Sequence, residues 1–327
     1  MKKDQPKYSA AAYGGENWSP RMASHQDEIG FLWGECGINA EWTRLQSVLL
    51  HPPGPELAVL DDPESAQLLE IPSWKLARQQ HDAIAQAYRE AGVTVHYVEP
   101  AGVPSPNQIF CADLFFMTPE GAILARPAST VRAGEDRWVA RRLTDLGIPI
   151  LRTLRGNAIF EGADAHWLNE RTVLIGCGLR TNKEAIAQIT SVLNEMNVEV
   201  IAVDLPVGTM HLMGILRFLA QDLALAWPYR LAWRAVEALR KCGYQVIYIP
   251  DEAESIHGGA LNFVTLGPRE ILLAAGNPIT QEFLESQGVI CHTVEVAELH
   301  KAAGGIGCLT GILKRELNGQ YALTELG

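Results

Sequence analysis

The sequence predicts an α/β protein, a five-bladed propeller whose pseudo-symmetric repeats each contain two strands, a helix and a third strand. Three observations lead to this fold. Four segments show this order of strand and helix patterns, they recur about every 50 residues, and pieces near both ends of the chain complete a fifth segment. A repeat of this length is typical of radial architectures, in which each unit buries its apolar face against its neighbours.

The clearest unit begins at residues 109–127, where two apolar runs flank the turn sequence PEG and predict a hairpin. Residues 135–147 have apolar positions at helical spacing and end in glycine, which predicts an amphipathic helix. Residues 148–153 are a short apolar run and predict the third strand.

The same order returns three times along the chain. Hairpins are expected at 160–178, 211–228 and 261–276, helices at 182–197, 229–243 and 278–288, and closing strands at 198–206, 244–250 and 289–295. The four hairpins open at Phe110, Phe160, His211 and Leu261, at separations of 50, 51 and 50 residues. A doubly wound sheet would need single strands between helices, so the hairpins argue against that alternative.

The fifth unit is divided between the two ends of the chain. Its strands are expected at 308–316, 45–53 and 93–100, and its helix at 73–92. The sequence therefore predicts one α/β propeller domain over residues 41–327, preceded by a polar N-terminal arm over residues 1–40.

Composition excludes several classes of protein. The net charge of −11 argues against binding to nucleic acids or anionic membrane surfaces. No apolar run approaches the roughly 18 residues of a membrane span, and residues 1–30 have no signal-peptide pattern. The six cysteines are scattered, without the spacing of a zinc site or a disulfide framework. We therefore expect a cytoplasmic protein without a metal.

The glycine-rich stretch AGGIGCLTG, residues 303–311, places Cys308 at the start of the predicted last strand. Glycine permits tight turns and close backbone approach, so this setting favours an accessible cysteine over a core one. Five other polar residues also lie near the start of a predicted hairpin: Asp113, Glu161, Asp164, His211 and Asn262. If the repeats superpose, these side chains meet Cys308 at one end of a central channel.

A cysteine, a histidine and several carboxylates suit attack on the central carbon of a cationic amidine. The thiolate is the nucleophile, and the histidine protonates the leaving amine and then activates water. Carboxylates bind a planar guanidinium through charge-assisted hydrogen bonds. A Cys/His pair alone would also suit an acyl-transfer enzyme, but buried carboxylates need cationic partners. We therefore expect a small cationic substrate.

At these residues the sequence resembles the guanidino-group-modifying superfamily, which includes arginine deiminase, dimethylarginine dimethylaminohydrolase and the amidinotransferases. The similarity lies in NQIFCADLFF, ARPASTVRAGE, FEGAD, IGCGLRTN, the HL pair at His211 and GGIGC, and EWTRLQSVLLHPP resembles the family's first strand. It extends from about residue 41 to residue 316, and the motifs occur in the family's order.

The resemblance implies roles for individual residues. Cys308, His211 and Glu161 match the family's catalytic residues, and Asp113 matches the aspartate that binds the guanidinium. Asp164 is placed with the substrate-binding acids, with a structural role as its alternative.

In arginine deiminases, an asparagine and two arginines grip the substrate's α-carboxylate. Asn107, Arg132 and Arg180 occupy similar places in this sequence, with a helix-capping or surface role as the alternative for Arg180.

One position departs from the commoner pattern. Deiminases and amidinotransferases typically read HLD or HID, whereas this chain reads HLM with Met213, and dimethylarginine dimethylaminohydrolases also lack that aspartate. We expect Met213 to offer an apolar wall that favours an N-alkylated guanidine or a ureido group over plain arginine. Its alternative role is to pack beside the site.

The sequence thus predicts a hydrolase that cleaves a carbon–nitrogen bond of a guanidino or related compound through a thiouronium-type intermediate on Cys308, without a cofactor. An amidinotransferase, a plain arginine deiminase and a catalytically silent binding protein are the alternatives. Segments 203–210 and 251–259 are expected to cover the site, and homo-oligomer formation is left open.

Overall fold

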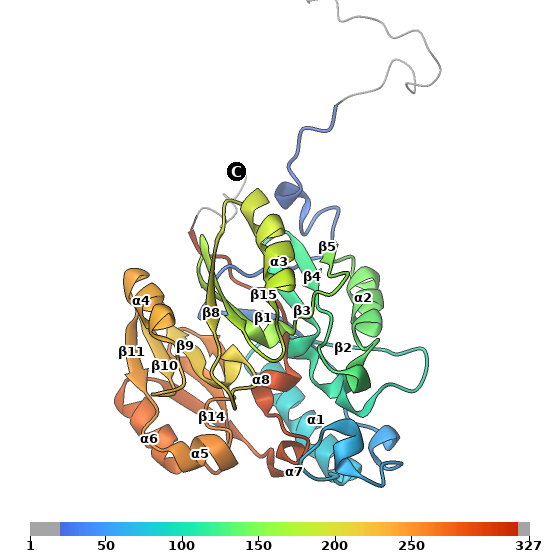
Figure 1. Ribbon diagram of the computed structural model, residues 1–327, viewed down its shortest axis with the longest axis vertical. Helices are drawn as coiled ribbons and strands as arrows, with labels where there is room; N and C mark the ends of the chain where they lie inside the picture. Colours follow the sequence, from blue (N-terminus) through green and yellow to red (C-terminus); the bar gives the residue numbers. More distant parts are fainter. Residues whose placement is uncertain (1–19, 320–327) are drawn as a thin grey trace, which may run out of the picture.

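The computed structural model describes residues 20–319, which form five three-stranded sheets with helices beside them (Figure 1). This arrangement confirms the predicted α/β class and the five units of three strands. Within these residues, no helix is both long enough and apolar enough to cross a bilayer.

All five sheets share one topology. A first strand pairs antiparallel with a centre strand, which pairs parallel with a third strand. The first strands are β3 (Phe115–Thr118), β6 (Ala165–Asn169), β9 (Leu216–Ala220), β12 (Val264–Gly267) and β15 (Gly311–Arg315). The centre strands are β4 (Gly121–Leu124), β7 (Thr172–Cys177), β10 (Leu223–Ala226), β13 (Glu270–Ala274) and β1 (Leu45–Leu50). The third strands are β5 (Ile150–Thr153), β8 (Glu199–Asp204), β11 (Gln245–Tyr248), β14 (Ile290–Val294) and β2 (Thr94–Tyr97).

One helix joins the centre strand to the third strand of each sheet, as a parallel connection requires. These helices are α2 (Asp136–Asp145), α3 (Lys183–Glu195), α4 (Trp233–Lys241), α6 (Pro278–Ser286) and α1 (Trp74–Glu90). In α3, the side chain of Asn182 caps the first turn by accepting a hydrogen bond from the Ala185 amide. Ile189 and Leu193, four residues apart on one face of α3, are fully buried.

The fifth sheet brings the two ends of the chain together. Its order is β15–β1–β2, with Val48 opposite Ile312 and Leu49 opposite Gly311 (Figure 1). The divided fifth unit predicted from the sequence is therefore present. Leu313 of β15 is buried in a core cluster that also includes residues of the next two sheets.

Part of the predicted N-terminal arm packs on the domain. Of residues 1–40, the first 19 lie outside the described residues, and Gln26–Glu28 form a short 3-10 helix. Cys36 and Ile38 are buried, and the Gly37 amide donates a hydrogen bond to the Leu313 carbonyl. This part of the arm extends the fifth sheet and is integral to the fold.

Short helical turns that the sequence did not predict precede four of the first strands. They are η6 (Cys111–Asp113), η8 (Gly162–Asp164), η9 (Leu212–Gly214) and α8 (Ile306–Leu309). The strand expected over 308–316 therefore begins only at Gly311, and Cys308 lies on α8. Two further short helices are α5 (Glu252–His257), within a segment expected to be a loop, and α7 (Ala297–His300). Because η6 contacts α8 and η8, and η8 contacts η9, the four turns bring their side chains to one place.

Candidate active site

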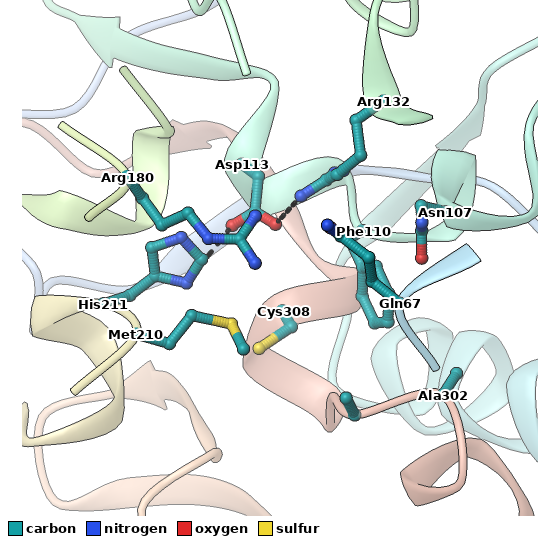
Figure 2. Close-up of a pocket in the computed structure, with 11 residues that line it drawn as sticks. Gln67, Asn107, Phe110, Asp113, Arg132, Arg180, Met210, His211, Ala302 and Cys308 are labelled. Carbon is teal, nitrogen blue, oxygen red and sulfur yellow. Dashed lines mark hydrogen bonds and ion pairs between the residues drawn. The ribbon is translucent and has the colours of Figure 1, made fainter. Parts of the chain in front are cut away.

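A cavity of about 40 Å³ lies where the short turns meet (Figure 2). Its lining residues are Gln67, Asn107, Phe110, Asp113, Arg132, Arg180, Met210, His211, Ala302, Ala303 and Cys308. Six of the predicted site residues line this pocket. Glu161 does not line the pocket but is hydrogen-bonded to His211, which does. Asp164 and Met213 are not lining residues either.

Asn262 holds Cys308 in place from the neighbouring repeat. Its side-chain amide donates to the Cys308 thiol over a distance of 3.0 Å between Nδ2 and Sγ, and its Oδ1 accepts the Cys308 backbone N–H at 3.0 Å. Burial and the charge of Asp113 raise the pKa of the thiol, and the hydrogen bond from Asn262 offsets them only in part. These surroundings therefore favour the thiol form of Cys308 at neutral pH.

The glycines around Cys308 make room for neighbouring side chains. A Cβ atom on Gly304 would lie 2.3 Å from the Phe110 ring, and one on Gly307 would lie 2.8 Å from Oδ1 of Asn262. These contacts are too short for any side chain, so glycine is required by close packing here rather than by a left-handed backbone. The residue before them, Ala303, does have a positive φ of 71°.

His211 and Glu161 form a buried ion pair. The Nε2 of His211 lies 2.7 Å from Oε2 of Glu161, which is fully buried. Burial alone would lower the pKa of His211, but the charge of Asp113 and the hydrogen bond to Glu161 raise it to about 9. Burial opposes ionisation of Glu161 as well, yet the hydrogen bond from His211 and the charges around it hold its pKa at about 2. His211 is therefore an imidazolium at neutral pH, as a general acid requires.

Asp113 presents a carboxylate to the pocket. Its Oδ2 accepts a hydrogen bond from Nη1 of Arg132 at 2.7 Å, while its buried Oδ1 has no hydrogen-bond partner and lies 3.9 Å from Nδ1 of His211. A buried acceptor without a partner carries a desolvation penalty of roughly 1–3 kcal/mol or more for a charged group. A cationic N–H donor in the pocket would relieve this penalty.

Arg132 is engaged by the protein itself. Besides Asp113, its guanidinium contacts Glu135, with 2.9 Å between Nε and Oε2, and Glu161, with 3.5 Å between Nη1 and Oε2. Burial alone would lower the pKa of Arg132, but these three acids raise it. Arg132 thus orients the carboxylates of the site.

Arg180 is the less enclosed of the two arginines in the pocket. Its Nη1 donates to Oε1 of Glu161 at 3.2 Å, and its side chain is partly buried at the pocket wall. Asn107 lies on the opposite side in Figure 2, and its Nδ2 donates to the Ala66 carbonyl at 2.7 Å. Asn107 and Arg180 thus border the pocket from two sides.

Two predicted substrate-binding residues lie away from the pocket. Asp164 is fully buried, and its carboxylate accepts hydrogen bonds from the Thr181 hydroxyl at 2.6 Å and the Leu212 amide at 2.9 Å. Burial raises its pKa to about 6. It fastens the turn that carries His211, which is the structural alternative considered for it.

Met213 borders a second cavity, and Met210 borders the pocket. Met213 is the middle residue of the 3-10 turn Leu212–Gly214, directly after His211. Its sulfur lies 3.2 Å from the position that a Cβ of Gly307 would occupy. The structure therefore does not place Met213 in the lining of this pocket, where Met210 lies instead.

Five lining residues were not predicted as site residues. Phe110 lies inside the motif NQIFCADLFF, and Met210 ends the segment 203–210 that was expected to cover the site. Ala302 and Ala303 directly precede GGIGC. Gln67 follows the turn at Pro63–Ala66 with a φ of 59°, and no sequence pattern distinguishes it. The other expected cover, 251–259, contributes no lining residue to this pocket.

Asp113, Glu161 and His211 have ligand atoms within 4.8 Å of one another, as a metal site would require. The set does not suit a resident cation, because Arg132 already lies between the two acids and His211 is paired with Glu161. Arg132 and His211 thus already supply positive charge to both acids, and among the carboxylate oxygens of these two acids Oδ1 of Asp113 alone lacks a hydrogen-bond partner.

Comparison with known proteins identifies the family of the chain. The model of the eukaryotic N,N-dimethylarginine dimethylhydrolase family matches residues 69–313. A protein of Mycobacterium tuberculosis named N(G),N(G)-dimethylarginine dimethylaminohydrolase is 29% identical over 247 residues, which cover 72% of this chain and 75% of the relative.

Two solved structures show the same fold. One is the dimethylaminohydrolase of Pseudomonas aeruginosa, a cysteine-to-serine variant complexed with citrulline, with a TM-score of 0.68, 21% identity and coverage of 82% of this chain and 98% of that one. The other is the amidinotransferase SxtG of Microseira wollei, with a TM-score of 0.72, 14% identity and coverage of 88% and 99%. The family match spans most of the chain and confirms the resemblance seen in the motifs: this protein belongs to the N,N-dimethylarginine dimethylhydrolase family, within the guanidino-group-modifying superfamily.

Proposed function

We propose that this protein hydrolyses a carbon–nitrogen bond of an N-substituted, arginine-like guanidino compound, with Cys308 as the nucleophile. The family confirms the class of reaction, a cysteine-dependent hydrolysis of guanidino compounds. The observation that carries the proposal for this chain is the unpartnered Oδ1 of Asp113 in a pocket shared with Cys308 and His211.

Asp113 binds the substrate by accepting guanidinium N–H groups. A cation between Asp113 and Cys308 neutralises the charge that raises the pKa of the thiol. Substrate binding therefore favours the thiolate, which is the nucleophilic form. Arg180 and Asn107 are the candidates for the α-carboxylate, since Arg132 is engaged with three acids.

The reaction proceeds in two halves. The Cys308 thiolate attacks the guanidinium carbon, and the amine leaves with a proton from His211 as the carbon–nitrogen bond breaks. This leaves an S-alkylthiouronium on Cys308 and a neutral His211. Water then attacks the same carbon and gives one proton to His211, and the carbon–sulfur bond breaks to release a neutral ureido product and the thiolate, while the second proton of the water passes to solvent or to the released amine. Glu161 and Arg132 position the acids and the imidazole throughout.

The pocket favours an N-substituted guanidinium over arginine. Asp113 is the one carboxylate among the described residues that line it, because Glu161 is fully buried and position 213 is a methionine outside the pocket. An unsubstituted guanidinium would leave donors unsatisfied there. An N-alkyl group can instead pack on Met210, since each buried methyl contributes about 0.8 kcal/mol.

We further propose that the five sheets close into a propeller over residues 41–327. The second cavity supports this arrangement, because its lining includes residues from the first strands of all five sheets. The six cysteines, all within the described residues, are unpaired, which supports the predicted cytoplasmic setting.

The test is a substrate screen with product analysis. N,N-dimethylarginine, N-monomethylarginine, arginine and agmatine are incubated with the enzyme, and dimethylamine, methylamine, ammonia and ureido products are measured. We expect amine release from the methylated arginines to exceed ammonia release from arginine, with one ureido product per amine. Equal or faster turnover of arginine would contradict the specificity, and transfer to an added amine such as glycine would identify an amidinotransferase instead.

The nucleophile is tested separately. Acid quench during turnover should give a covalent adduct on the peptide containing Cys308, detected by mass spectrometry. Cys308→Ser should give no adduct and no product, because a hydroxyl is far less ionised than a thiol. The matched control is Cys291→Ser, a partly buried cysteine on β14 outside the pocket. Product formation by Cys308→Ser at the wild-type rate would refute the mechanism.

A further inference from the structure

A second cavity, of about 50 Å³, lies behind the turn that carries Cys308. Gly307, next to Cys308, forms part of its wall, and each first strand of the five sheets contributes at least one lining residue, together with Glu41 and other residues outside these strands. The space is enough for a few water-sized groups. It is separate from the proposed substrate pocket, which shares none of its lining residues.

Four ionisable side chains line this cavity: Glu41, His166, Arg217 and Arg315. His166 is the second residue of β6 and Arg217 the second residue of β9, so the repeat places both at equivalent positions. The three basic residues are more than nine-tenths buried.

The polar groups of the cavity are not satisfied by the protein. Both ring nitrogens of His166 and the Nε atoms of Arg217 and Arg315 have no hydrogen-bond partner. Each arginine keeps one terminal contact, from Arg217 to the Phe263 carbonyl and from Arg315 to the Thr43 carbonyl at 2.6 Å between Nη1 and O. Buried donors without acceptors are strongly unfavourable, so these groups require an acceptor in the cavity.

The side chains of the cavity also carry more positive than negative charge. Two guanidinium groups face one carboxylate, that of Glu41, whose Oε1 lies 3.5 Å from Nδ1 of His166 and accepts the Trp167 amide. Burial lowers the pKa of Arg217, and it lowers that of Arg315 to about 10. Guanidinium groups nevertheless keep their proton in proteins, so we count both as charged. One positive charge is therefore uncompensated even when His166 is neutral, and such a charge is costly in a protein interior.

From this juxtaposition we infer that the second cavity is a binding site for a small monovalent anion of the halide class, held by Arg217 and Arg315 with His166 at its side. A halide accepts several N–H donors without geometric preference and supplies the one missing negative charge. Chloride is only slightly larger than water, so it suits a cavity of this volume, whereas a divalent oxyanion would bring excess charge. The inference is independent of the substrate proposed above.

The first test uses bromide as the probe. Crystals of the wild-type protein grown in sodium bromide should show an anomalous peak in the cavity, within hydrogen-bonding distance of the Arg217 or Arg315 guanidinium. In halide-free gluconate buffer at constant ionic strength, adding chloride or bromide should raise the melting temperature in a saturable way, because a ligand that binds only the folded state stabilises it.

The second test uses variants. Arg217→Met and, as an independent route, Arg315→Met should weaken the halide effect on melting temperature at least about tenfold in apparent affinity. Arg269→Met is the matched control, since Arg269 is exposed and pairs with Asp222 on the surface, and it should keep the wild-type response. A cavity that contains only water in the bromide crystals, or a halide response that both cavity variants retain, would overturn the inference.

Discussion

The pKa values of Cys308 and His211 allow only a small fraction of the enzyme to carry a thiolate and an imidazolium together before the substrate binds. The reaction needs a thiolate and an imidazolium together, but burial and Asp113 raise the pKa of Cys308, and the pKa of His211 is about 9. The thiol and the imidazolium therefore coexist at neutral pH. In the proposed mechanism, the contact between Asp113 and the cationic substrate shifts Cys308 toward the thiolate.

The dependence of kcat/KM on pH reports this balance. Below both pKa values, the fraction of enzyme with a thiolate and an imidazolium rises tenfold per pH unit, so kcat/KM should increase with that slope between about pH 6 and 8 and level off near pH 9, where His211 loses its proton. A fall in kcat/KM is expected only at higher pH, once both groups are deprotonated, because the pKa of Cys308 is also raised. Glu161→Gln should move the end of the rising limb to lower pH, since it removes an anion that raises the pKa of His211. A profile that is flat from pH 6 to 8 would contradict this scheme.

Asp113→Asn keeps the shape of the side chain and removes its charge. Breaking a buried charge pair with the substrate costs on the order of 2–5 kcal/mol, which corresponds to a loss of roughly 30- to 5000-fold in kcat/KM. Steady-state kinetics with a methylated arginine measure the loss. Asp222→Asn, an exposed acid paired with Arg269, should leave the kinetics unchanged. If both variants retain wild-type kcat/KM, Asp113 does not bind the guanidinium.

At the level of elements, the short turns before the first strands decide where the site residues point. The hairpins, helices and third strands follow from apolar periodicity and agree with the structure within a few residues, as for α3 against the predicted 182–197. The turns are too short to have a period. The position of Met213, which lines the second cavity, was not predictable for this reason, because one residue along a 3-10 turn changes the side of the turn that a side chain occupies.

The sequence was more informative about which residues form the site than about which of their side chains interact with one another. The repeat placed Asp113, His211 and Cys308 at equivalent positions, and the pocket contains all three. It did not reveal that three protein carboxylates engage Arg132, although Glu135 is the last residue of the motif ARPASTVRAGE. It also missed Gln67, which reaches the pocket from a loop without regular structure.

Gly304→Ala tests the close packing between the glycine-rich segment before α8 and the ring of Phe110. The added methyl would lie 2.3 Å from the Phe110 ring, so α8 or the ring must move. We expect a destabilisation of about 1–3 kcal/mol, measured by chemical denaturation, together with a lower kcat/KM. Gly102→Ala is the matched control, because its methyl would meet only an ordinary contact at 4.0 Å from Trp138. Unchanged stability and activity of Gly304→Ala would show that the glycines are dispensable.

At the scale of the whole molecule, the pairing of β15 with β1 links the core to the nucleophile. Leu313 is buried in β15, five residues after Cys308, and its carbonyl accepts the Gly37 amide from the N-terminal side of the chain. Loss of this strand would release the turn that carries Cys308 as well as one edge of the fifth sheet.

Leu313→Ala should therefore destabilise the fold and the site together. Truncating a buried leucine costs about 2–5 kcal/mol, whereas Ile290→Ala, at a side chain that is 61% exposed on β14, should change stability by about 0.5 kcal/mol or less. Thermal unfolding followed by far-UV circular dichroism and by labelling of Cys308 should shift by the same amount. If Cys308 becomes reactive well below the temperature at which strands are lost, the site opens independently of the fold.

The fifth sheet also has a consequence for biosynthesis. The centre strand β1 leaves the ribosome early, but its partner β15 follows after most of the described chain has been made. At about 5–20 residues per second, this delay is on the order of 10–50 s. During that time the backbone groups on one edge of β1 await their partner, and an exposed strand edge is a template for association with other chains. The risk of association with other chains thus lasts until the segment with Cys308 and β15 has been made. The same segment supplies both the nucleophile and the last strand of the fifth sheet.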